Sequence, residues 1–368
     1  MNDQEYMKIA LGLAAAAAGQ TSPNPAVGAV IVKDGEIAGM GAHLKAGEDH
    51  AEIHALKMAG DKARDATMYV TLEPCSHFGK TPPCAAALIK AGIKRVYISS
   101  ADPNPLVAGK GIKMLEEAGI EVHSGLLSEK GDELNEVFFH FIRTGTPFVT
   151  MKQAVTLDGK TAAESGDSKW ITCEESRLDV HRERSRHDAI LVGINTVLKD
   201  NPRLTNRINR EARQPVRIIL DTHLRTPKDC AAIKDETAET LIITGSEAEQ
   251  KNIDLIESDK VKVLRMPSDS IKIMDVLKIL AKRGITSLYV EGGSEVNASF
   301  LKEHAVGRMI TYIAPKLAGK KAHGMFGDLN VKMMHDAYSL EFEKVERIGK
   351  DLKITSRLKQ VEKCSQES

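Results

Sequence analysis

The composition of the chain excludes several classes of protein before any motif is considered. Of its 368 residues, 42% are hydrophobic and 28% are charged, which is typical of an ordinary soluble globular protein. Lysine plus arginine equals aspartate plus glutamate at 51 each, so no global basic field would gather nucleic acid. A small anionic substrate fits this balance better than a polymer does.

The N-terminal stretch and the cysteines bear on where the protein works. The alanine-rich stretch 9–19 is shorter than the roughly 20 apolar residues that a membrane span needs. Asp3 and Glu5 precede it, where a signal peptide would carry net positive charge, so we expect an amphipathic helix. Five scattered cysteines favour a reduced, cytoplasmic protein without a disulfide framework.

Residues 1–145 alternate between predicted helices and strands. Turn formers delimit them: a turn-rich segment at 21–25, a tight Asp34-Gly35 hairpin turn, and Gly60 and Gly92 after helices. In chain order we expect a helix over 3–18, strands over 27–32 and 36–40, a helix over 50–59, a strand over 67–72, a helix over 84–91, a strand over 95–100, a helix over 111–118 and a strand over 120–123.

A cluster of turn formers at 143–147 separates this half from a second one with the same alternation. There we expect strands over 148–153, 189–192, 216–220, 240–244, 261–264 and 287–290, and a helix over 271–281. No internal repeat relates the halves. We therefore predict two different domains, 1–145 and 146–360, followed by a polar tail at 361–368.

The sharpest signal in the first half is a set of metal-ligand types: His50 and Glu52 in an H-x-E pattern, then Cys75, then Cys84. A catalytic zinc needs three protein ligands and an open position for water, and one imidazole with two thiolates meets that count. The metal lowers the pKa of its water toward about 7, and Glu52 would take the proton and deliver it to a leaving amine. We therefore predict the histidine and the two cysteines as ligands and Glu52 as the catalytic residue.

The spacing of these residues matches a known pattern in part. His50 is predicted at a helix start and Cys75 after a strand end, so both can reach one crevice at the carboxyl ends of the strands. H-x-E followed by P-C-x-x-C is the signature of zinc deaminases, but here residues 76–83 separate the two cysteines. Three other interpretations stay open: a zincin protease, whose H-E-x-x-H pattern places the glutamate elsewhere; a structural zinc closed by His54 or His77; and inert buried cysteines.

Three long motifs narrow the family: PCSHFGKTPPC at 74–84, TSPNPAVGAV at 21–30 and DPNPLVAGKG at 102–111. They closely resemble the bifunctional deaminase/reductases of riboflavin biosynthesis, and the resemblance extends to near residue 355. It implies a cytidine-deaminase-like, three-layer α/β domain that hydrolyses the ring amine of a diaminopyrimidinone ribosyl phosphate and releases ammonia. By the same resemblance, the substrate pocket would be lined by Asn24, His43, His77, Lys80, Asp102 and Asn104.

Elementary chemistry fits these pocket residues. Asparagine and aspartate can read ring donors and acceptors, while His77 and Lys80 place positive charge in a loop that could meet a phosphate. For each of them an ordinary turn role stays open. Asn104, for example, lies between prolines, where turn chemistry alone would suffice.

The second half lacks the G-x-G-x-x-G fingerprint, so a Rossmann cofactor site is not expected. Instead a predicted strand runs into Gly292-Gly293 and then a predicted helix, whose first amides could hold a phosphate, although a plain connector would have the same pattern. The motifs MKQAVTLDGK at 151–160, SKWIT at 168–172 and VGINTVLKDNP at 192–202 resemble the reductase domain of the same family. That domain is similar in fold to dihydrofolate reductase.

The resemblance implies that the second domain uses NADPH to reduce the ribosyl group to a ribityl chain by hydride delivery to the sugar C1. Cofactor contacts would fall on Ala154, Trp170, Thr196, Asp200 and a loop of Gly293, Ser294, Glu295, Val296, Asn297, Ala298 and Ser299. Substrate contacts would fall on Ser168, Arg184, Leu204, Arg207 and Glu291. Lys152 joins Glu291 as a candidate for orienting the opened sugar.

Residue chemistry leaves several of these roles open. Trp170 could be a core anchor or an aromatic wall for a cofactor. Arg184 and Arg207 could clamp the ribosyl phosphate bidentately, or each could be a solvated surface charge. Asp200 could assist proton movement. The preference for NADPH over NADH rests on the resemblance.

Two other functions stay open at this point: a deaminase of nucleic-acid bases, and a binding module without chemistry. Neutral net charge and a pocket loop with His77 and Lys80 favour a free, nucleotide-like substrate. A binding module would not require the histidine, the glutamate and both cysteines together. We therefore expect a small-molecule enzyme without nucleic-acid or membrane partners, and the resemblance implies self-association into a homo-oligomer.

Overall fold

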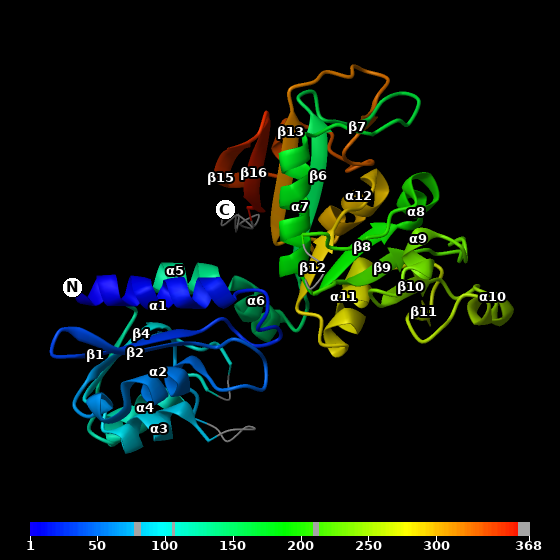
Figure 1. Ribbon diagram of the computed structural model, residues 1–368. Helices are drawn as coiled ribbons and strands as arrows, with labels where there is room; N and C mark the ends of the chain where they lie inside the picture. Colours follow the sequence, from blue (N-terminus) through cyan, green and yellow to red (C-terminus); the bar gives the residue numbers. More distant parts are fainter. Residues whose placement is uncertain (77–81, 105–106, 209–212, 360–368) are drawn as a thin grey trace, which may run out of the picture. The chain divides into compact units, whose positions relative to one another are not determined.

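The chain folds into two compact units, Met1–Thr146 and Pro147–Ser368. The computed structural model in Figure 1 describes residues 1–76, 82–104, 107–208 and 213–359. His77 and Lys80, and the polar tail predicted at 361–368, lie outside the described residues. No helix of the described part is both long and apolar enough to cross a membrane.

The first unit is built around a mixed sheet of order β2-β1-β3-β4-β5. Strand β1 pairs antiparallel with β2 and β3, and β3, β4 and β5 run parallel. Its elements are α1 (Asp3–Ala17), β1 (Gly28–Lys33), β2 (Glu36–Ala42), α2 (Ala51–Ala59), a 3-10 turn (Gly60–Ala63), β3 (Thr67–Leu72), α3 (Cys84–Ala91), β4 (Arg95–Ser100), α4 (Lys110–Glu117), β5 (Glu121–Ser124), α5 (Ser128–Leu134) and α6 (Glu136–Thr144).

Alternation along the strands produces the predicted three layers. Ile31 and Met68 face the core cluster formed with α2, α3 and α4, whereas the neighbouring Val30 and Tyr69 face α1 and α5. Successive side chains of a strand point to opposite faces, so a strand with apolar residues at every position needs a helical layer on both sides. Figure 1 shows α1 and α5 on one face of the sheet and α2, α3 and α4 on the other.

Glycines let two helices approach the antiparallel edge of this sheet. A Cβ on Gly28 would lie 2.0 Å from the carbonyl oxygen of Ala10 in α1, and one on Gly41 would lie 2.2 Å from that of Ala51 in α2. Both distances are far below any van der Waals contact, so only glycine permits this spacing. The second contact sets the start of α2, where His50 is the N-cap.

We expect Gly41→Ala to displace α2 and lower the free energy of unfolding of the first unit by about 1–3 kcal/mol, the usual cost of overpacking. The matched control is Gly12→Ala in α1, whose Cβ would meet nothing within 4 Å. That change should stabilise the helix by about 0.5–1 kcal/mol. Thermal unfolding of the three proteins, followed by circular dichroism, measures both effects, and equal melting temperatures would contradict the packing argument.

The second unit has a sheet of order β11-β10-β9-β8-β12-β6-β13-β16-β15. The strands from β11 to β13 run parallel, and β16 and β15 are antiparallel to their neighbours. Its elements are β6 (Phe148–Thr156), β7 (Lys160–Ala162), α7 (Glu174–Arg186), β8 (Ala189–Gly193), α8 (Ile194–Asp200), β9 (Val216–Leu220), α9 (Ala231–Lys234), β10 (Thr240–Thr244), α10 (Gln250–Asp254), β11 (Val261–Arg265), α11 (Ile273–Lys282), β12 (Ser287–Val290), α12 (Ser294–Lys302), β13 (Arg308–Ala314), β14 (His323–Gly324), a 3-10 turn (Met334–Asp336), β15 (Leu340–Ile348) and β16 (Asp351–Leu358).

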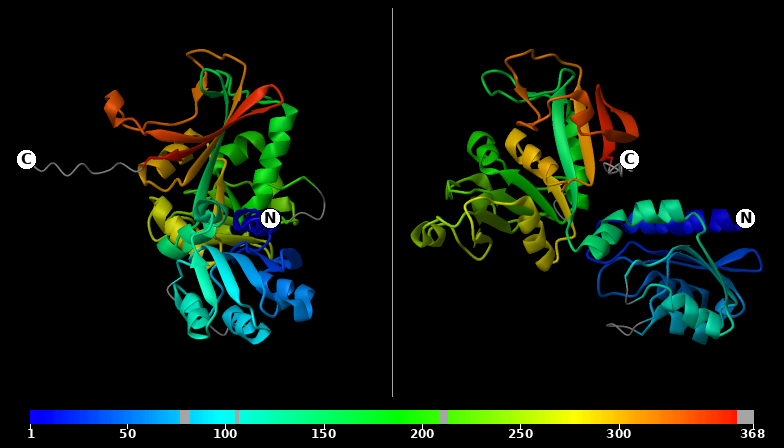
Figure 2. Two further views of the ribbon diagram at one scale, coloured as in Figure 1. Left: turned by 90° about the vertical axis from the view of Figure 1, so that its left-hand side faces the viewer. Right: turned by 180° about the vertical axis from the view of Figure 1, so that it is seen from behind.

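Helices cover both faces of the parallel part of this sheet. Leu191 and Val290 pack with α11 and α12, whereas Ile190 and Val192 pack with α8 and α9. Val180 of α7 packs against Tyr289 on the same side as α8 (Figure 2). Both units are therefore α/β domains, as predicted.

The predicted strands and helices are confirmed to within a few residues, whereas the helices α5 to α10 and the strands β7 and β13 to β16 were not predicted. Helix α7 reads EESRLDVHRERSR, and its polar side chains gave no apolar stripe. Its buried residues include Glu183, which binds the equally buried Lys353 at 2.9 Å. A charge pair between residues 170 positions apart therefore fixes this helix on the sheet, and a local pattern of apolar residues cannot predict such a pair.

Candidate active sites

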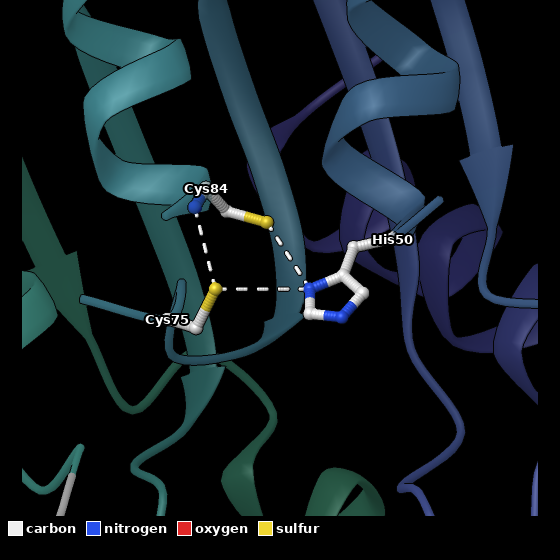
Figure 3. Close-up of side chains that lie close together, drawn as sticks. All are labelled: His50, Cys75 and Cys84. Atoms are coloured by element: carbon white, nitrogen blue, oxygen red, sulfur yellow. Dashed lines mark hydrogen bonds between the residues drawn. The ribbon is translucent and has the colours of Figure 1, made fainter. Parts of the chain in front are cut away.

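His50, Cys75 and Cys84 lie together in the first unit, with their ligand atoms all within 4.8 Å of one another. His50 Nδ1 is 3.2 Å from Cys84 Sγ and 3.7 Å from Cys75 Sγ (Figure 3). Tetrahedral zinc with Zn–N of about 2.0 Å and Zn–S of about 2.3 Å requires N···S separations of about 3.5 Å. The donor set and its spacing therefore fit zinc.

Chain direction brings these three ligands together. His50 is the N-cap of α2, Cys84 opens α3, and Cys75 follows β3. Both helices thus direct their N-terminal ends at the cluster, and the main-chain N–H of Cys84 donates to Cys75 Sγ at 3.3 Å. Hydrogen bonds from Cys84, together with the nearby imidazole, lower the pKa of the Cys75 thiol to about 4. A thiolate at helix N-termini is the form that binds metal.

Glu52 stands in the first turn of α2 and is 3% exposed. It lines a cavity of about 540 Å³ together with His50 and Cys75. Burial raises the pKa of its carboxyl, although the nearby His50 opposes that shift. His54 is not part of the ligand cluster. The described residues therefore form a three-ligand site with a carboxyl group beside it, which is the composition of a catalytic rather than a closed structural zinc site.

The other predicted pocket residues in the described part line the same cavity. Asn24 comes from the loop before β1, His43 follows β2, and Asp102 and Asn104 follow β4. These segments are far apart in the sequence and meet because the loops at one end of the sheet converge.

Hydrogen bonds fix the tautomer of His43 and the orientation of the Asn24 amide in the cavity. The amide Nδ2 of Asn24 donates to Nε2 of His43 at 3.1 Å, so Nδ1 carries the imidazole proton and donates to the carbonyl of Asp49 at 3.2 Å. Burial lowers the pKa of His43, which favours this neutral form. The Oδ1 of Asn24 is then the acceptor that this residue can offer to a ligand.

Several residues that line the cavity were not predicted as site residues: Glu73, Val27, Leu72, Val107 and Phe138. Most are apolar, as expected of the walls of a small-molecule site. Glu73 is a carboxylate at the carboxyl end of a buried strand, two residues before a predicted zinc ligand. That position was the signal that could have identified it.

In the second unit, Arg184, Glu291 and Lys152 form a charged cluster. Arg184 Nε and Nη2 contact Glu291 Oε1 and Oε2 at 2.6 and 3.1 Å, and Lys152 Nζ is 3.6 Å from Glu291 Oε2. Burial alone would raise the pKa of Glu291, but the charges of Arg184 and Lys152 and the paired hydrogen bonds hold it at about 2. Three predicted substrate residues are thus brought together, from β6, α7 and the end of β12.

The remaining predicted substrate residues differ in their surroundings. Arg207 is partly buried, and its pKa is lowered by burial and then by the charges of Arg184 and Arg203. His181, which was not predicted, lies in the field of the same two site arginines, Arg184 and Arg207, and burial with those charges lowers its pKa to about 4. Leu204 is 3% exposed. Ser168 is half-buried in an irregular segment.

The predicted cofactor residues do not form one contact cluster like that of Lys152, Arg184 and Glu291. Trp170 is 63% exposed, with the guanidinium of Arg177 4.6 Å from its ring centre, so the core-anchor interpretation is wrong. Asp200 is exposed at the end of α8, Thr196 is half-buried in that helix, and Ala154 is half-buried in β6. Trp170 and Arg207 line different cavities.

The segment predicted as a cofactor loop is a helix. Gly293 is the N-cap of α12, and Ser294, Glu295, Val296, Asn297, Ala298 and Ser299 form its first turns. Two of them point inward: Asn297 is 1% exposed and donates from Nδ2 to the carbonyl of Met325 at 3.0 Å, and Ala298 is 3% exposed. The glycine pair therefore ends a strand and starts a helix, which is the geometry of an anion-binding helix N-terminus.

Comparisons with known proteins agree with both halves. Residues 1–100 match the model of the cytidine and deoxycytidylate deaminase zinc-binding region, and residues 147–354 match that of the RibD C-terminal domain. The chain is 51% identical over 355 residues to the riboflavin biosynthesis protein RibD of Bacillus amyloliquefaciens, covering 96% of both chains. It is 41% identical to that of Escherichia coli K12, covering 96% of this chain and 98% of the relative.

Solved structures of such proteins share the fold. That of Acinetobacter baumannii RibD, form 1, is 38% identical with a TM-score of 0.88, covering 97% of this chain and 99% of that one. That of a diaminohydroxyphosphoribosylaminopyrimidine deaminase/5-amino-6-(5-phosphoribosylamino)uracil reductase from Thermotoga maritima is also 38% identical, with a TM-score of 0.87, covering 97% and 98%. With a zinc-ligand cluster in its first unit and such relatives along almost its whole length, the chain belongs to the RibD family, the bifunctional deaminase/reductases of riboflavin biosynthesis.

Proposed function

We propose that residues 1–145 deaminate the ring of a diaminopyrimidinone ribosyl phosphate and that residues 146–360 then reduce its ribosyl group to ribityl with NADPH. The observation that carries the first step is one cavity in which a His-Cys-Cys cluster and a buried glutamate meet polar side chains suited to a pyrimidine ring. The Thermotoga maritima relative is named as a deaminase of diaminohydroxyphosphoribosylaminopyrimidine, which supports the choice of substrate.

In the deaminase site, Glu52 is the proton carrier. Zinc held by His50, Cys75 and Cys84 would supply an activated water. Glu52 takes a proton at its carboxylate and later gives it to the leaving amine, and its raised pKa brings it closer to neutral pH, where such transfer is most efficient. The water-excluded position of this carboxyl, at 3% exposure, supports the role.

Ring recognition falls to the polar residues of the cavity. Asn24 offers its Oδ1 to a ring N–H or exocyclic amine, because His43 holds its Nδ2. Asp102 and Asn104 face the same cavity from the β4 side. His77 and Lys80 complete the proposal as the cationic residues that meet the substrate phosphate.

In the reductase site, the charged cluster of Lys152, Arg184 and Glu291 orients the opened sugar, and Arg207 with Ser168 and Leu204 borders the substrate. NADPH would supply the hydride. Its contacts are proposed on Ala154, Trp170, Thr196, Asp200 and the start of α12, where Gly293 and the first-turn amides can hold an anionic group.

The proposal extends to the setting of the enzyme. We infer a cytoplasmic homo-oligomer that acts on a small nucleotide-like substrate, without nucleic-acid or membrane partners. The neutral net charge supports the absence of a polyanionic partner. Self-association is supported by the edge strand β15, which exposes Phe342 and Val345 at 66% and 56%.

A coupled assay tests the function. Ammonia release and NADPH oxidation are followed separately on the diaminopyrimidinone ribosyl phosphate, with zinc-loaded protein and with protein stripped by a chelator. We expect stripped protein to lose ammonia release and regain it with added zinc. Reduction of pre-deaminated substrate should proceed in both samples, since the zinc ligands all lie in the first unit.

Two outcomes would count against the proposal. Zinc-loaded wild-type protein that releases no ammonia would refute the deaminase assignment. Equal loss of both activities on chelation, without unfolding, would refute the division of the two reactions between residues 1–145 and 146–360.

A further inference from the structure

Glu73 binds the main chain of residues 102–112, the segment between β4 and α4 that contains the pocket residues Asp102 and Asn104. It follows strand β3, lies two residues before Cys75, and is 4% exposed. Its Oε2 accepts hydrogen bonds from the main-chain N–H groups of Asp102 at 3.4 Å and Gly109 at 3.0 Å. One carboxylate oxygen thus binds both ends of the stretch from β4 to α4.

The other oxygen of Glu73 caps helix α4. Oε1 accepts from the N–H groups of Gly111 at 3.0 Å and Ile112 at 3.4 Å, which are 38 and 39 residues away in the sequence. These are the groups that a serine or aspartate N-cap normally satisfies, but the N-cap here is Gly109, which has no side chain to do so. The negative charge also suits the positive end of the helix dipole.

A close main-chain approach accompanies these hydrogen bonds. A Cβ on Gly111 would lie 2.0 Å from the carbonyl oxygen of Pro74 and 3.2 Å from Oε1 of Glu73. The first turn of α4 therefore packs directly on the chain next to Cys75. Gly111 and the carboxylate of Glu73 therefore both hold the start of α4 against residues 73–74, directly before the zinc ligand Cys75.

Local hydrogen bonds transmit this constraint to the pocket. Asp102 Oδ1 accepts from the N–H of Asn104 at 2.8 Å, and the carbonyl of Asn104 accepts from Val107 and Ala108 at 2.8 Å each. The positions of Asp102 and Asn104 relative to the cluster of His50, Cys75 and Cys84 therefore depend on where Glu73 holds the segment.

We propose that Glu73 is a positioning residue of the deaminase site, which sets the separation between the zinc-ligand cluster and the substrate-binding residues Asp102 and Asn104. The inference rests on the proposed deaminase function. Glu73→Gln is the isosteric test, because an amide keeps one acceptor oxygen and turns an NH₂ group toward two N–H donors. Misplacement of binding groups by a fraction of an ångström weakens substrate binding more than it changes the proton carrier.

We expect Glu73→Gln to raise the KM for deamination by about tenfold, while kcat changes less than about threefold. Zinc content and reduction of pre-deaminated substrate should stay at wild-type values. Hydrogen exchange should become faster at residues 107–112 and stay unchanged in α2. Glu73→Asp, which keeps the charge but is one methylene shorter, should give an intermediate KM, and it decides the matter if the glutamine variant does not fold.

Glu303→Gln is the matched control. Glu303 accepts from the N–H groups of Ile273 at 2.8 Å and Met274 at 2.9 Å, so it caps α11 in the second unit as Glu73 caps α4. Glu303→Gln should leave the KM for deamination unchanged. If the KM of Glu73→Gln rose only because a weakened helix cap lowers the stability of the protein, Glu303→Gln would raise the KM as well.

Three results would overturn the inference: a wild-type KM in both Glu73 variants; a lower kcat with lost zinc at an unchanged KM; or fully multiplicative effects of Glu73→Gln and Asn104→Ala. The last result would mean that Glu73 does not act through this segment. If wild-type protein released no ammonia, the proposed function would fail instead. The hydrogen exchange at residues 107–112 would still decide whether Glu73 holds the segment.

Discussion

Glu52→Gln is expected to lower kcat for deamination by about three orders of magnitude, the middle of the range for loss of a positioned proton carrier. Glutamine fills the same volume at this 3% exposed position but cannot accept and return a proton. Steady-state ammonia release measures the loss. Because Glu52 is not one of the three clustered ligands, zinc should stay bound in the variant, as checked by metal analysis.

Glu48→Gln is the control for this experiment. Glu48 lines the same cavity but is exposed at its rim, so its removal should change kcat by less than about twofold. The Glu52 variant should still oxidise NADPH with pre-deaminated substrate. A Glu52→Gln protein that deaminates at the wild-type rate would require another proton carrier.

Arg184→Met is expected to destabilise the second unit by about 3–5 kcal/mol and to abolish measurable reduction. The substitution removes both hydrogen bonds to Glu291 and leaves that carboxylate buried with Lys152 3.6 Å away. A buried charge that loses its paired partner costs far more than an exposed one. Denaturant unfolding and NADPH oxidation measure the two effects.

The pH dependence of stability gives a second measure of the same pair. The folded state holds the pKa of Glu291 at about 2, below its ordinary value of 4.5. The pair therefore stabilises the fold fully above pH 4.5, and this stabilisation is lost as the pH falls from 4.5 toward 2. In Arg184→Met the pKa of Glu291 should rise, so less stability remains to be lost over that range.

Arg186→Ala provides the control on the same helix. Its guanidinium contacts Glu183 at 3.5 Å but is 66% exposed, so the change should alter stability by less than about 1 kcal/mol. An Arg184→Met protein as stable as Arg186→Ala would show that the Arg184–Glu291 pair contributes little. The reductase proposal would then lose its main structural support.

Much of the first unit could be predicted from the sequence because its signals are local. Gly92 adopts the left-handed conformation that ends α3, as its position after an apolar helix predicted. The three ligands could be predicted in the same way, since His50 and Cys84 lie at helix starts and Cys75 follows a strand. Despite the longer spacing between the cysteines, Cys84 at the start of α3 lies beside Cys75 (Figure 3).

The second unit was predicted less completely because its site depends on contacts between distant segments. Arg184 and Glu291 are 107 residues apart, and the polar helix α7, which contains Arg184, has no apolar stripe from which it could be predicted. The start of α12 was expected as a cofactor loop, although the helix begins directly after Gly293. For Trp170 the sequence allowed either a core anchor or a wall of the cofactor site, and its exposure in the structure excludes the core anchor.

The sequence by itself predicted the order of the helices and strands from α1 to β5, the three residues of the zinc-ligand cluster, and a glutamate close to them in the chain. Each of these depends on residue chemistry and on spacing within one or two turns of chain. Only the tertiary structure decided that Glu73 caps a helix 38 residues away and that Arg184 pairs with Glu291. Burial and long-range hydrogen bonding set the geometry and the pKa values of such groups, and neither is encoded in any local pattern.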